Sequence, residues 1–282
     1  MGLSFLSRRA LAVGAVVVAG VFGLSACGTG ASSDDAASSN APAAGGPKLV
    51  TPGKLTTCTN LPYEPFQFKE GDKVVGFDVD IVDLAAKKLG LTQEIVDIDF
   101  AVIKSGAAMA AGKCDVAAAG MTITPERQAN IDFSVPYFDA TQALLARKGV
   151  NVKTLDEIKA QGLKFGAQAS TTGLDYAKKQ GLSPKEFADS PKELLGLQSG
   201  QADVIIQDLP VVLTWLKKPE IADKFELVAS LDTGEQYGVG LKKGADPVLL
   251  KAIDDAITTA KSDGTYEQIF LKWFGKKPGE LG

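Results

Sequence analysis

The sequence contains no histidine, only three cysteines and two tryptophans, and its formal net charge is only -4. Without histidine, the chain cannot form a Ser/His/Asp or Cys/His triad or a histidine-ligated metal site. It also lacks the side chain that most often transfers protons near neutral pH. The small negative charge argues against a nucleic-acid partner, because such proteins usually present a basic face. These absences exclude histidine-dependent catalysis and disfavour nucleic-acid recognition.

The start of the chain has the order of features expected of an export signal. Arg8 and Arg9 precede an uncharged apolar run over residues 10–24, and small residues follow. The string Leu24-Ser25-Ala26-Cys27 resembles a bacterial lipobox, which implies a lipoprotein signal peptide over 1–26 and a palmitate-type lipid on Cys27. An uncleaved membrane anchor is the alternative, and the paired arginines leave Sec or twin-arginine export open.

Residues 28–47 contain no large apolar side chain and consist mainly of Ala, Ser, Gly, Asp, Asn and Pro. A segment of this composition cannot bury a core and spans about 25 Å as a flexible chain. We therefore predict that 27–47 is a lipidated cysteine and flexible linker, which tethers a folded body to the extracytoplasmic face of the cell membrane. A disordered tail without a role is the alternative.

Two further cysteines, Cys58 and Cys114, would lie in an oxidising compartment after export. Each stands in a strand-like stretch, 54–60 and 114–119, and a disulfide requires these strands to be neighbours. We consider Cys58 and Cys114 a possible disulfide. Two small buried thiols are the alternative, because a catalytic thiol has no histidine to activate it.

From residue 48 onward, the pattern predicts strands alternating with helices. The expected strands are 55–60, 95–98, 114–119, 164–168, 204–207 and 225–229, with a hairpin bent at 71–72. The expected helices are 78–89, 103–112, 172–179, 209–216, 247–262 and 265–274. Ser190, Pro191 and Glu193 predict the N-cap, N1 and N3 positions of one more helix. Two similar halves predict an α/β protein in which ligands bind beyond the carboxyl ends of the strands.

Seven strings occur in order from about residue 55 to 274. They are Tyr63-Glu64-Pro65-Phe66, Gly76-Phe77-Asp78-Val79-Asp80, Gly120-Met121-Thr122-Ile123-Thr124-Pro125-Glu126-Arg127, Asp132-Phe133-Ser134, Gln168-Ala169-Ser170-Thr171-Thr172-Gly173, Gln207-Asp208 and Asp263-Gly264-Thr265-Tyr266. In their order and spacing, these strings resemble the polar amino-acid substrate-binding proteins of ABC importers, which are family 3 solute-binding lipoproteins.

The resemblance implies a two-lobed periplasmic-binding-protein-like fold of type II. Each lobe would hold a mostly parallel sheet flanked by helices, and the chain would cross twice between the lobes, near 138–141 and 235–238. Lobe 1 would then comprise 48–138 plus 236–282, and lobe 2 would comprise 139–235.

By resemblance, Arg127 binds the ligand carboxylate beside Thr122, Asp208 binds the ammonium, and Thr171 and Thr172 begin a helix that faces the ligand. These residue types suit a zwitterion, because a carboxylate pairs with a planar two-pronged donor and an ammonium with a carboxylate. Each position has a plainer alternative. Arg127 would otherwise be an exposed arginine on a short helix, and Asp208 and the threonines would be ordinary helix caps.

The same family places an aromatic lid at Tyr63, with Phe100 as its opposing partner. The spacing from Phe100 to the next strand is about two residues longer than the common pattern, so Val102 is the alternative partner. Ala119 and Gly120 stand where several relatives carry serines. The floor of the predicted pocket therefore has fewer hydroxyl groups, although backbone groups at these positions could still contact a ligand.

The function implied is a lipid-anchored extracytoplasmic receptor, expected to be monomeric, that binds a polar L-amino acid by hinge closure and delivers it to an ABC transporter permease. Glutamate or glutamine is the favoured ligand, because Asn60 stands where relatives selective for basic side chains carry an aspartate. No cofactor is implied. Asp78, Asp80 and Asp83 form an acidic cluster, but the first two suit the first turn of a helix better than a metal site.

Two other functions are possible on the same scaffold. An enzyme resembling cyclohexadienyl dehydratase would need a carboxylic acid in the cleft as a proton donor, and Glu64 or Asp208 would have to supply it. A ligand-sensing receptor domain is the second alternative. It is disfavoured because nothing after the last predicted helix could span a membrane.

Overall fold

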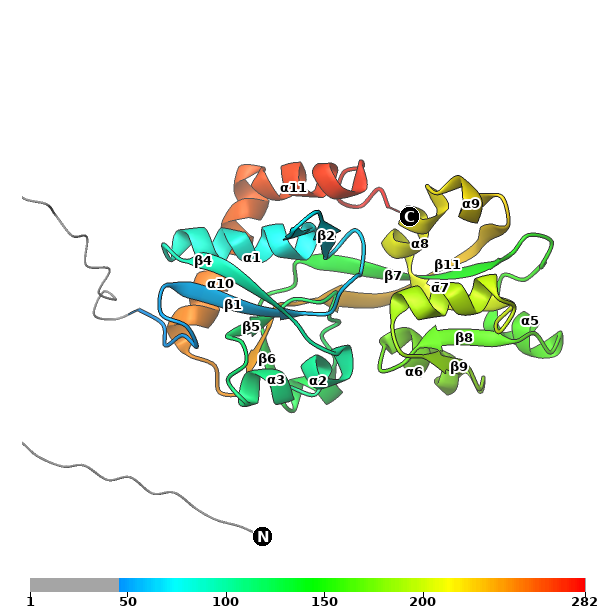
Figure 1. Ribbon diagram of the computed structural model, residues 1–282, viewed down its shortest axis with the longest axis horizontal. Helices are drawn as coiled ribbons and strands as arrows, with labels where there is room; N and C mark the ends of the chain where they lie inside the picture. The colour runs from blue at the N-terminus through cyan, green and yellow to red at the C-terminus, as the bar shows by residue number, and fades with distance from the viewer. Residues whose placement is uncertain (1–45, 282) are drawn as a thin grey trace, which may run out of the picture. The chain divides into compact units, whose positions relative to one another are not determined.

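The computed structural model describes residues 46–281. The predicted signal peptide, the predicted lipidation site Cys27 and most of the predicted linker lie outside the described residues. The described part contains two five-stranded sheets, one two-stranded hairpin and flanking helices (Figure 1). Within 46–281, every helix is too short or too polar to cross a membrane.

The first sheet has the strand order β4-β1-β5-β12-β6. Its strands are β1 (Lys54–Thr59), β4 (Thr92–Asp97), β5 (Val116–Ala117), β6 (Ile131–Phe133) and β12 (Gly240–Lys242). β1 runs parallel to β4 and β5, whereas β12 is antiparallel to β5 and β6. The associated helices are α1 (Phe77–Lys88), α2 (Phe100–Lys104), α3 (Ala107–Ala110), α4 (Pro125–Gln128), α10 (Pro247–Asp263) and α11 (Thr265–Phe274). Helix α1 packs against α10 and α11, while α2 contacts β1 and α3 contacts β12.

The second sheet has the order β11-β7-β10-β8-β9. Its strands are β7 (Phe138–Arg147), β8 (Phe165–Gln168), β9 (Lys185–Phe187), β10 (Val204–Asp208) and β11 (Phe225–Tyr237). Its helices are α5 (Leu155–Ala160), α6 (Thr172–Lys179), α7 (Ser190–Gln198), α8 (Leu209–Leu216) and α9 (Pro219–Ala222). The hairpin of β2 (Phe68–Glu70) and β3 (Lys73–Val75) stands apart from both sheets.

Strands β7 and β11 connect the two sheets and pair with each other in antiparallel register, from Phe138 opposite Tyr237 to Arg147 opposite Phe225. The register shifts between Leu231 and Glu235, beside the predicted second crossing. In each sheet four of the five strands run in the same direction, with β12 reversed in the first sheet and β7 reversed in the second, so each sheet is mostly parallel, as predicted.

Two predicted elements of the first half differ from the structure. The predicted helix over 103–112 is two short helices, α2 and α3, separated at Gly106. Gly106 has φ 79°, and an added Cβ would lie 2.8 Å from the carbonyl oxygen of Asn130, so the backbone turns where only glycine fits. The predicted strand over 114–119 is confined to Val116–Ala117. Cys114 therefore precedes the strand.

The start of α7 also differs from the prediction. Asp189, not Ser190, is the N-cap, and its side chain accepts the backbone N–H of Lys192 at 2.8 Å. Glu193 does not reach back to the cap. Its side chain is fully buried. The spacing that predicted a capping box therefore reflects a different role for Glu193.

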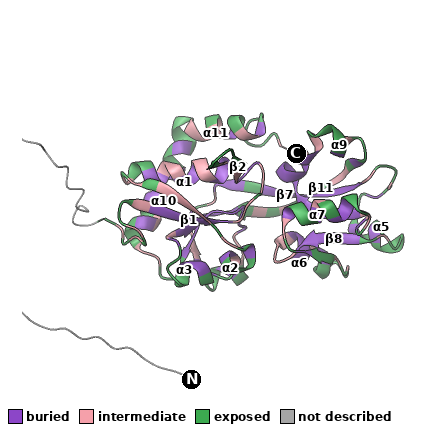
Figure 2. Cartoon of the chain, viewed as in Figure 1, coloured by how far each residue is buried: buried purple, intermediate pink, exposed green. Residues whose placement is uncertain are grey.

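Buried residues fill the space between the sheets and their helices (Figure 2). An aromatic cluster joins α1, the start of β7 and α11, with ring centroids of Phe77 and Phe274 5.0 Å apart and those of Phe138 and Phe270 5.8 Å apart. Phe138 also stacks on Tyr237 with centroids 5.3 Å apart. These contacts fix the two connecting strands to the first sheet, where the cavity described below begins.

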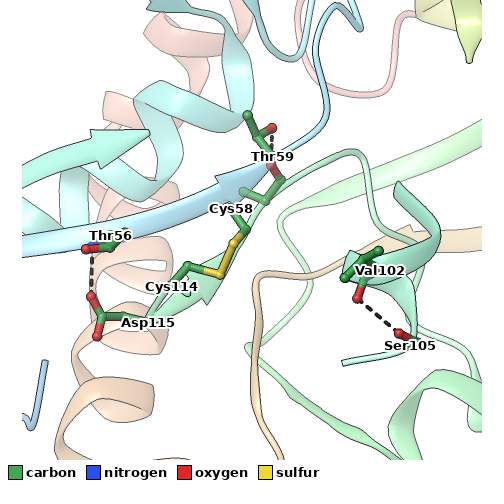
Figure 3. The surroundings of a disulfide bond; sticks show 8 residues. Thr56, Cys58, Thr59, Val102, Ser105, Cys114 and Asp115 are labelled. Atoms are coloured by element: carbon green, nitrogen blue, oxygen red, sulfur yellow. Dashed lines mark hydrogen bonds between the residues drawn. A yellow bond between two sulfur atoms is a disulfide. The ribbon is translucent and has the colours of Figure 1, made fainter. Parts of the chain in front are cut away.

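Cys58 and Cys114 form a disulfide, with an S–S distance of 1.99 Å and a sequence separation of 56 residues (Figure 3). Cys58 lies on β1 opposite Ala117 of β5, so the two strands are neighbours. Asp115 accepts the backbone N–H of Thr56 at 2.8 Å. The disulfide and this bond hold the residues that lead into β5 against β1.

Candidate functional site

A cavity lies where the carboxyl ends of strands from both sheets meet. The first sheet and its loops contribute Asn60, Tyr63, Gln67, Phe100, Ala119, Gly120, Thr122 and Arg127. The second contributes Gln142, Gln168, Thr171, Thr172, Ile206, Gln207 and Asp208. Every residue for which the sequence predicts ligand contact therefore lines a single cavity. The position agrees with the rule that ligands of α/β sheets bind beyond the carboxyl ends of strands.

Arg127 is buried, with 6% of its surface exposed, on the short helix α4. Thr124 caps this helix by accepting the backbone N–H of Arg127 at 3.2 Å. The guanidinium donates to the carbonyl oxygens of Thr122 at 2.8 Å and Ser170 at 3.4 Å, and lies 5.5 Å from the centroid of Phe100. Burial lowers the pKa of Arg127 from its usual value. The alternative of an exposed arginine is wrong.

Asp208 is also buried, with 7% of its surface exposed, between the end of β10 and the start of α8. Its carboxylate accepts hydrogen bonds from Gln142 Nε2 and from the hydroxyls of Tyr63 and Tyr237. Burial raises the pKa of Asp208, and the three hydrogen bonds oppose that rise. Asp208 occupies the N-cap position of α8, but its side chain makes no capping hydrogen bond. The carboxylate faces the cavity instead.

Tyr63 reaches across the cavity from the first sheet's side. Its hydroxyl lies 2.7 Å from Gln207 Oε1 and also contacts Asp208. Gly120 makes room for the ring, because a Cβ there would lie 2.8 Å from Tyr63 Cε1. The Gly120 N–H donates to Asp78 Oδ2 at 2.7 Å. This N–H is thus used inside the protein.

Phe100, not Val102, is the second aromatic or apolar wall. Phe100 lines the cavity and is 8% exposed, whereas Val102 is 36% exposed and lies outside the lining.

On the opposite side, Thr171 caps α6 by accepting the N–H of Leu174 at 3.2 Å, so its ordinary capping role is present. The Thr172 hydroxyl donates to Glu235 Oε2 at 3.0 Å.

Five lining residues were not predicted from the sequence: Gln67, Gln142, Gln168, Ile206 and Gln207. Gln168 and Gln207 stand at the ends of predicted strands, so the strand-end rule could have marked them. Gln142 lies inside the long strand β7 and Gln67 next to a hairpin, where no pattern points to a ligand. The glutamine side chains are uncharged, so they give no pattern in the sequence that would mark them as ligand-binding residues.

Asp78 supports the floor of the cavity. It is 1% exposed on α1, and it accepts the Gly120 N–H at 2.7 Å and the Tyr137 hydroxyl at 2.8 Å. Burial raises the pKa of Asp78 to about 7.

Asp80 stands in the first turn of α1, as predicted, and its carboxylate accepts hydrogen bonds from Lys272 Nζ and Trp273 Nε1, each at 2.7 Å. Within 46–281, acidic and cysteine side chains form no cluster that could hold a metal ion.

The raised pKa of Asp78 predicts a pH dependence of stability. The folded state holds the proton up to about pH 7, whereas the unfolded chain releases it near the ordinary aspartate pKa of 3.8. Between these values the folded state binds more protons, so the free energy of unfolding should fall as pH rises, by at most about 1.4 kcal/mol per pH unit for this group. Urea denaturation of Asp78→Asn should show a flatter slope from pH 5 to 7. An unchanged slope would contradict this assignment.

Comparison with known families identifies the protein class. The profile of the bacterial extracellular solute-binding proteins, family 3, matches residues 55–276, which is well over half of the chain. The chain belongs to this family. The family predicted from the seven strings is thus confirmed, and the solved structures similar to this family-3 protein confirm the type II two-lobed fold.

Individual relatives cover most of this solute-binding protein. A probable histidine-binding protein of Neisseria gonorrhoeae is 31% identical over 280 residues, covering 95% of this chain and 97% of its own. An ancestral arginine-binding protein bound to glutamine is 38% identical with a TM-score of 0.73, covering 79% of this chain and 99% of that one. An ancestral amino acid-binding protein, a precursor of cyclohexadienyl dehydratase, is 32% identical with a TM-score of 0.70, covering 79% and 95%.

Proposed function

We propose that this solute-binding protein captures a polar L-amino acid, with glutamine the favoured ligand, and delivers it to the permease of an ABC importer. The observation that carries the proposal is the placement of a buried cation, Arg127, and a buried carboxylate, Asp208, on opposite sides of one cavity. The related proteins include a probable histidine-binding protein and an ancestral arginine-binding protein bound to glutamine, which supports the same class of ligand.

The donors and acceptors of the cavity suit the two charged groups of an amino acid. Arg127 uses two N–H groups on carbonyl oxygens, and a guanidinium has five, so several remain for a ligand carboxylate. The N-terminus of α6 at Thr172 lies on the same cavity and favours negative charge. Asp208 accepts from Gln142 Nε2 and the Tyr237 hydroxyl and shares the one Tyr63 hydroxyl proton with Gln207 Oε1, so a carboxylate with about four acceptor positions can still accept from an ammonium.

The side-chain end of the cavity presents acceptors, and this favours glutamine over glutamate. Gln67 is 1% exposed, its Nε2 donates to the Asn60 carbonyl oxygen at 3.3 Å, and its Oε1 has no hydrogen-bond partner among residues 46–281. Asn60 Nδ2 donates to the Ile98 carbonyl oxygen at 3.1 Å, which leaves Oδ1 as its acceptor. A glutamine amide can donate to these oxygens, whereas a glutamate carboxylate cannot.

A cationic amino acid is the second candidate, and one observation favours it. Glu235 contacts Thr172 and Gln142 beside the cavity. Two carboxylates, those of Asp208 and Glu235, therefore lie at the cavity, whereas Arg127 is the single cation among its lining residues. A ligand with a positive side chain would reduce this negative excess. Asn60 argues the other way, because it supplies a neutral oxygen where a basic side chain would gain from a carboxylate.

Delivery requires a protein held outside the cytoplasmic membrane that opens and closes. We propose lobe 1 as 48–138 plus 236–282 and lobe 2 as 139–235, with closure about the paired strands β7 and β11. The same proposal includes a signal peptide over 1–26, a lipid on Cys27, a flexible linker that ends at residue 47, and a monomeric protein. The closed form would dock on the permease, which would open it.

The enzymatic alternative finds less support in the cavity. Glu64 is half-exposed, lies 3.8 Å from Lys218 Nζ and is not among the lining residues. Asp208 accepts three hydrogen bonds, an arrangement that suits a carboxylate rather than a proton donor. The related structure named as a dehydratase precursor is itself described as an amino acid-binding protein.

A thermal-shift screen of the twenty amino acids tests the ligand. L-Glutamine at 100 times its dissociation constant should stabilise the protein by about 2.7 kcal/mol. L-Glutamate is the matched control, because it differs only in replacing the amide donor by a carboxylate, and it should shift the melting temperature far less. A largest shift with glutamate would contradict the acceptor argument, and one with arginine or lysine would favour the cationic candidate. No response to any amino acid would remove the proposal.

A further inference from the structure

Glu193 is a fully buried carboxyl outside the cavity lining. It lies on α7 with 0% of its surface exposed. Helix α7 is held tightly against β9, because a Cβ on Gly196 would come within 2.2 Å of the Phe187 ring. The helix therefore cannot withdraw to let water reach Glu193 without repacking. A carboxyl buried in this way is costly unless it has a specific partner.

Among residues 46–281, Gln207 is the side-chain partner of Glu193. Gln207 Nε2 donates to Glu193 Oε2 at 2.8 Å, and the backbone N–H of Gln168 also faces the carboxyl. At its other end, Gln207 Oε1 accepts the backbone N–H of Asp208 at 2.8 Å and lies 2.7 Å from the Tyr63 hydroxyl. Gln207 thus stands between the buried acid and two residues of the amino-acid site.

An amide side chain has donors at one end and an acceptor at the other, so fixing one end fixes both. With Nε2 held by Glu193, the oxygen of Gln207 must face Tyr63. Without Glu193, the two N–H groups of the amide would lose their buried acceptor. The backbone N–H of Asp208 would then be the remaining group that holds the oxygen in place, so the orientation of the amide would be less strongly fixed.

We propose that Glu193 is a positioning residue for the amino-acid site: through Gln207 it holds an acceptor toward Tyr63, and so favours the closed arrangement of the two lobes. The inference rests on the proposed closure over an amino acid. It explains why a carboxyl with a single side-chain partner is buried here, since a buried acid of this kind adds little stability by itself. We call the contacts from Glu193 through Gln207 to Tyr63 the relay. In it, Glu193 and Gln207 belong to the proposed lobe 2 and Tyr63 to the proposed lobe 1.

The neutral form of Glu193 suffices for this role. Burial raises the pKa of Glu193 well above its usual range, and the hydrogen bond from Gln207 opposes that rise. The acceptor oxygen is present in a carboxylic acid as in a carboxylate. Glutamine at this position has the same shape and the same acceptor, so Glu193→Gln should preserve the contact, whereas Glu193→Leu keeps a similar volume and removes it.

A double-mutant cycle with Tyr63 separates positioning from general stability. L-Glutamine affinity, measured by calorimetry, should change less than about twofold in Glu193→Gln and fall about fivefold to tenfold in Glu193→Leu. In the Tyr63→Phe background, the hydroxyl that receives the relay is absent, so adding Glu193→Leu should cost less than about twofold. A purely structural role would give the same cost in both backgrounds, and that result would overturn the proposal.

A ligand-free measurement keeps this test independent of the ligand assignment. Spin labels at Lys104→Cys and Lys179→Cys, which line opposite sides of the cleft mouth, report the distance between lobes. Glu193→Gln should retain the wild-type distribution, and Glu193→Leu should shift it toward longer distances. If the wild-type protein binds no glutamine, the ligand proposal fails while these distances still test Glu193. Identical distributions in all three proteins would contradict the positioning role.

Discussion

Replacing Arg127 by alanine should reduce amino-acid affinity by about 3–5 kcal/mol, roughly two to four orders of magnitude. The guanidinium is the cation that lines the cavity, and it is 6% exposed. Its removal would leave the ligand carboxylate buried in a closed cleft without a countercharge. The fold should survive, because the hydrogen bonds of the guanidinium end on two backbone carbonyls that lie in loops.

Two further variants separate this contact from a change in net charge. Lys179→Ala removes one positive charge from the cleft mouth without removing a lining residue of the cavity, so it should bind nearly as well as the wild type. Arg127→Lys keeps the charge but loses the two-pronged geometry, and it should bind with intermediate affinity. Isothermal titration calorimetry measures all three. Undiminished affinity in Arg127→Ala would remove the mechanism.

Replacing Asp208 by asparagine should lower affinity by a similar amount, about 3–5 kcal/mol, because the ligand ammonium would lose its buried carboxylate. The effect on the protein alone should be different. Burial raises the pKa of Asp208, so its charge is unfavourable within the free protein. The asparagine keeps one oxygen acceptor among Gln142, Tyr63 and Tyr237. We therefore expect lost affinity without lost stability of the ligand-free protein.

Asp203→Asn is the matched control for Asp208→Asn. Asp203 precedes the same strand, β10, at its opposite end, and its Oδ2 accepts the backbone N–H of Lys164 at 2.9 Å. The control makes the same chemical change on the same strand, far from the cavity lining. Its affinity should match that of the wild type. If both variants lost affinity equally, a general electrostatic effect would replace the specific ammonium contact.

The regular elements of the fold were largely predictable from local patterns. Helices over 172–179 and 209–216 have the predicted bounds, because strong start signals and apolar spacing agree there. The break at Gly106 was not predictable by spacing alone, since the apolar pattern continues through it. The N-cap of α7 was misplaced by one residue because aspartate, serine and proline stand together at 189–191, and each suits that turn.

For the site, the sequence indicated the charged ligand-binding residues but not the residues that support them. Arg127 and Asp208 came from the resemblance, and charge chemistry explained why they suit a zwitterion. Glu193 was misread as a capping residue, because its real partner, Gln207, lies 14 positions away and meets it only in the folded protein. Asp78 stands in the first turn of α1 as predicted, but the sequence did not indicate that its carboxylate also holds Gly120. Tertiary partners of this kind leave no periodic or local signal.

The most direct test of the account is a calorimetric titration of L-glutamine into the wild-type protein. We predict saturable binding of one glutamine per protein chain, with a negative heat-capacity change as the cleft closes around the ligand. The binding should disappear in Arg127→Ala under the same conditions. Absence of binding heat for glutamine and for the other nineteen amino acids, in a protein that melts cooperatively, would contradict the central claim that the cavity is an amino-acid site.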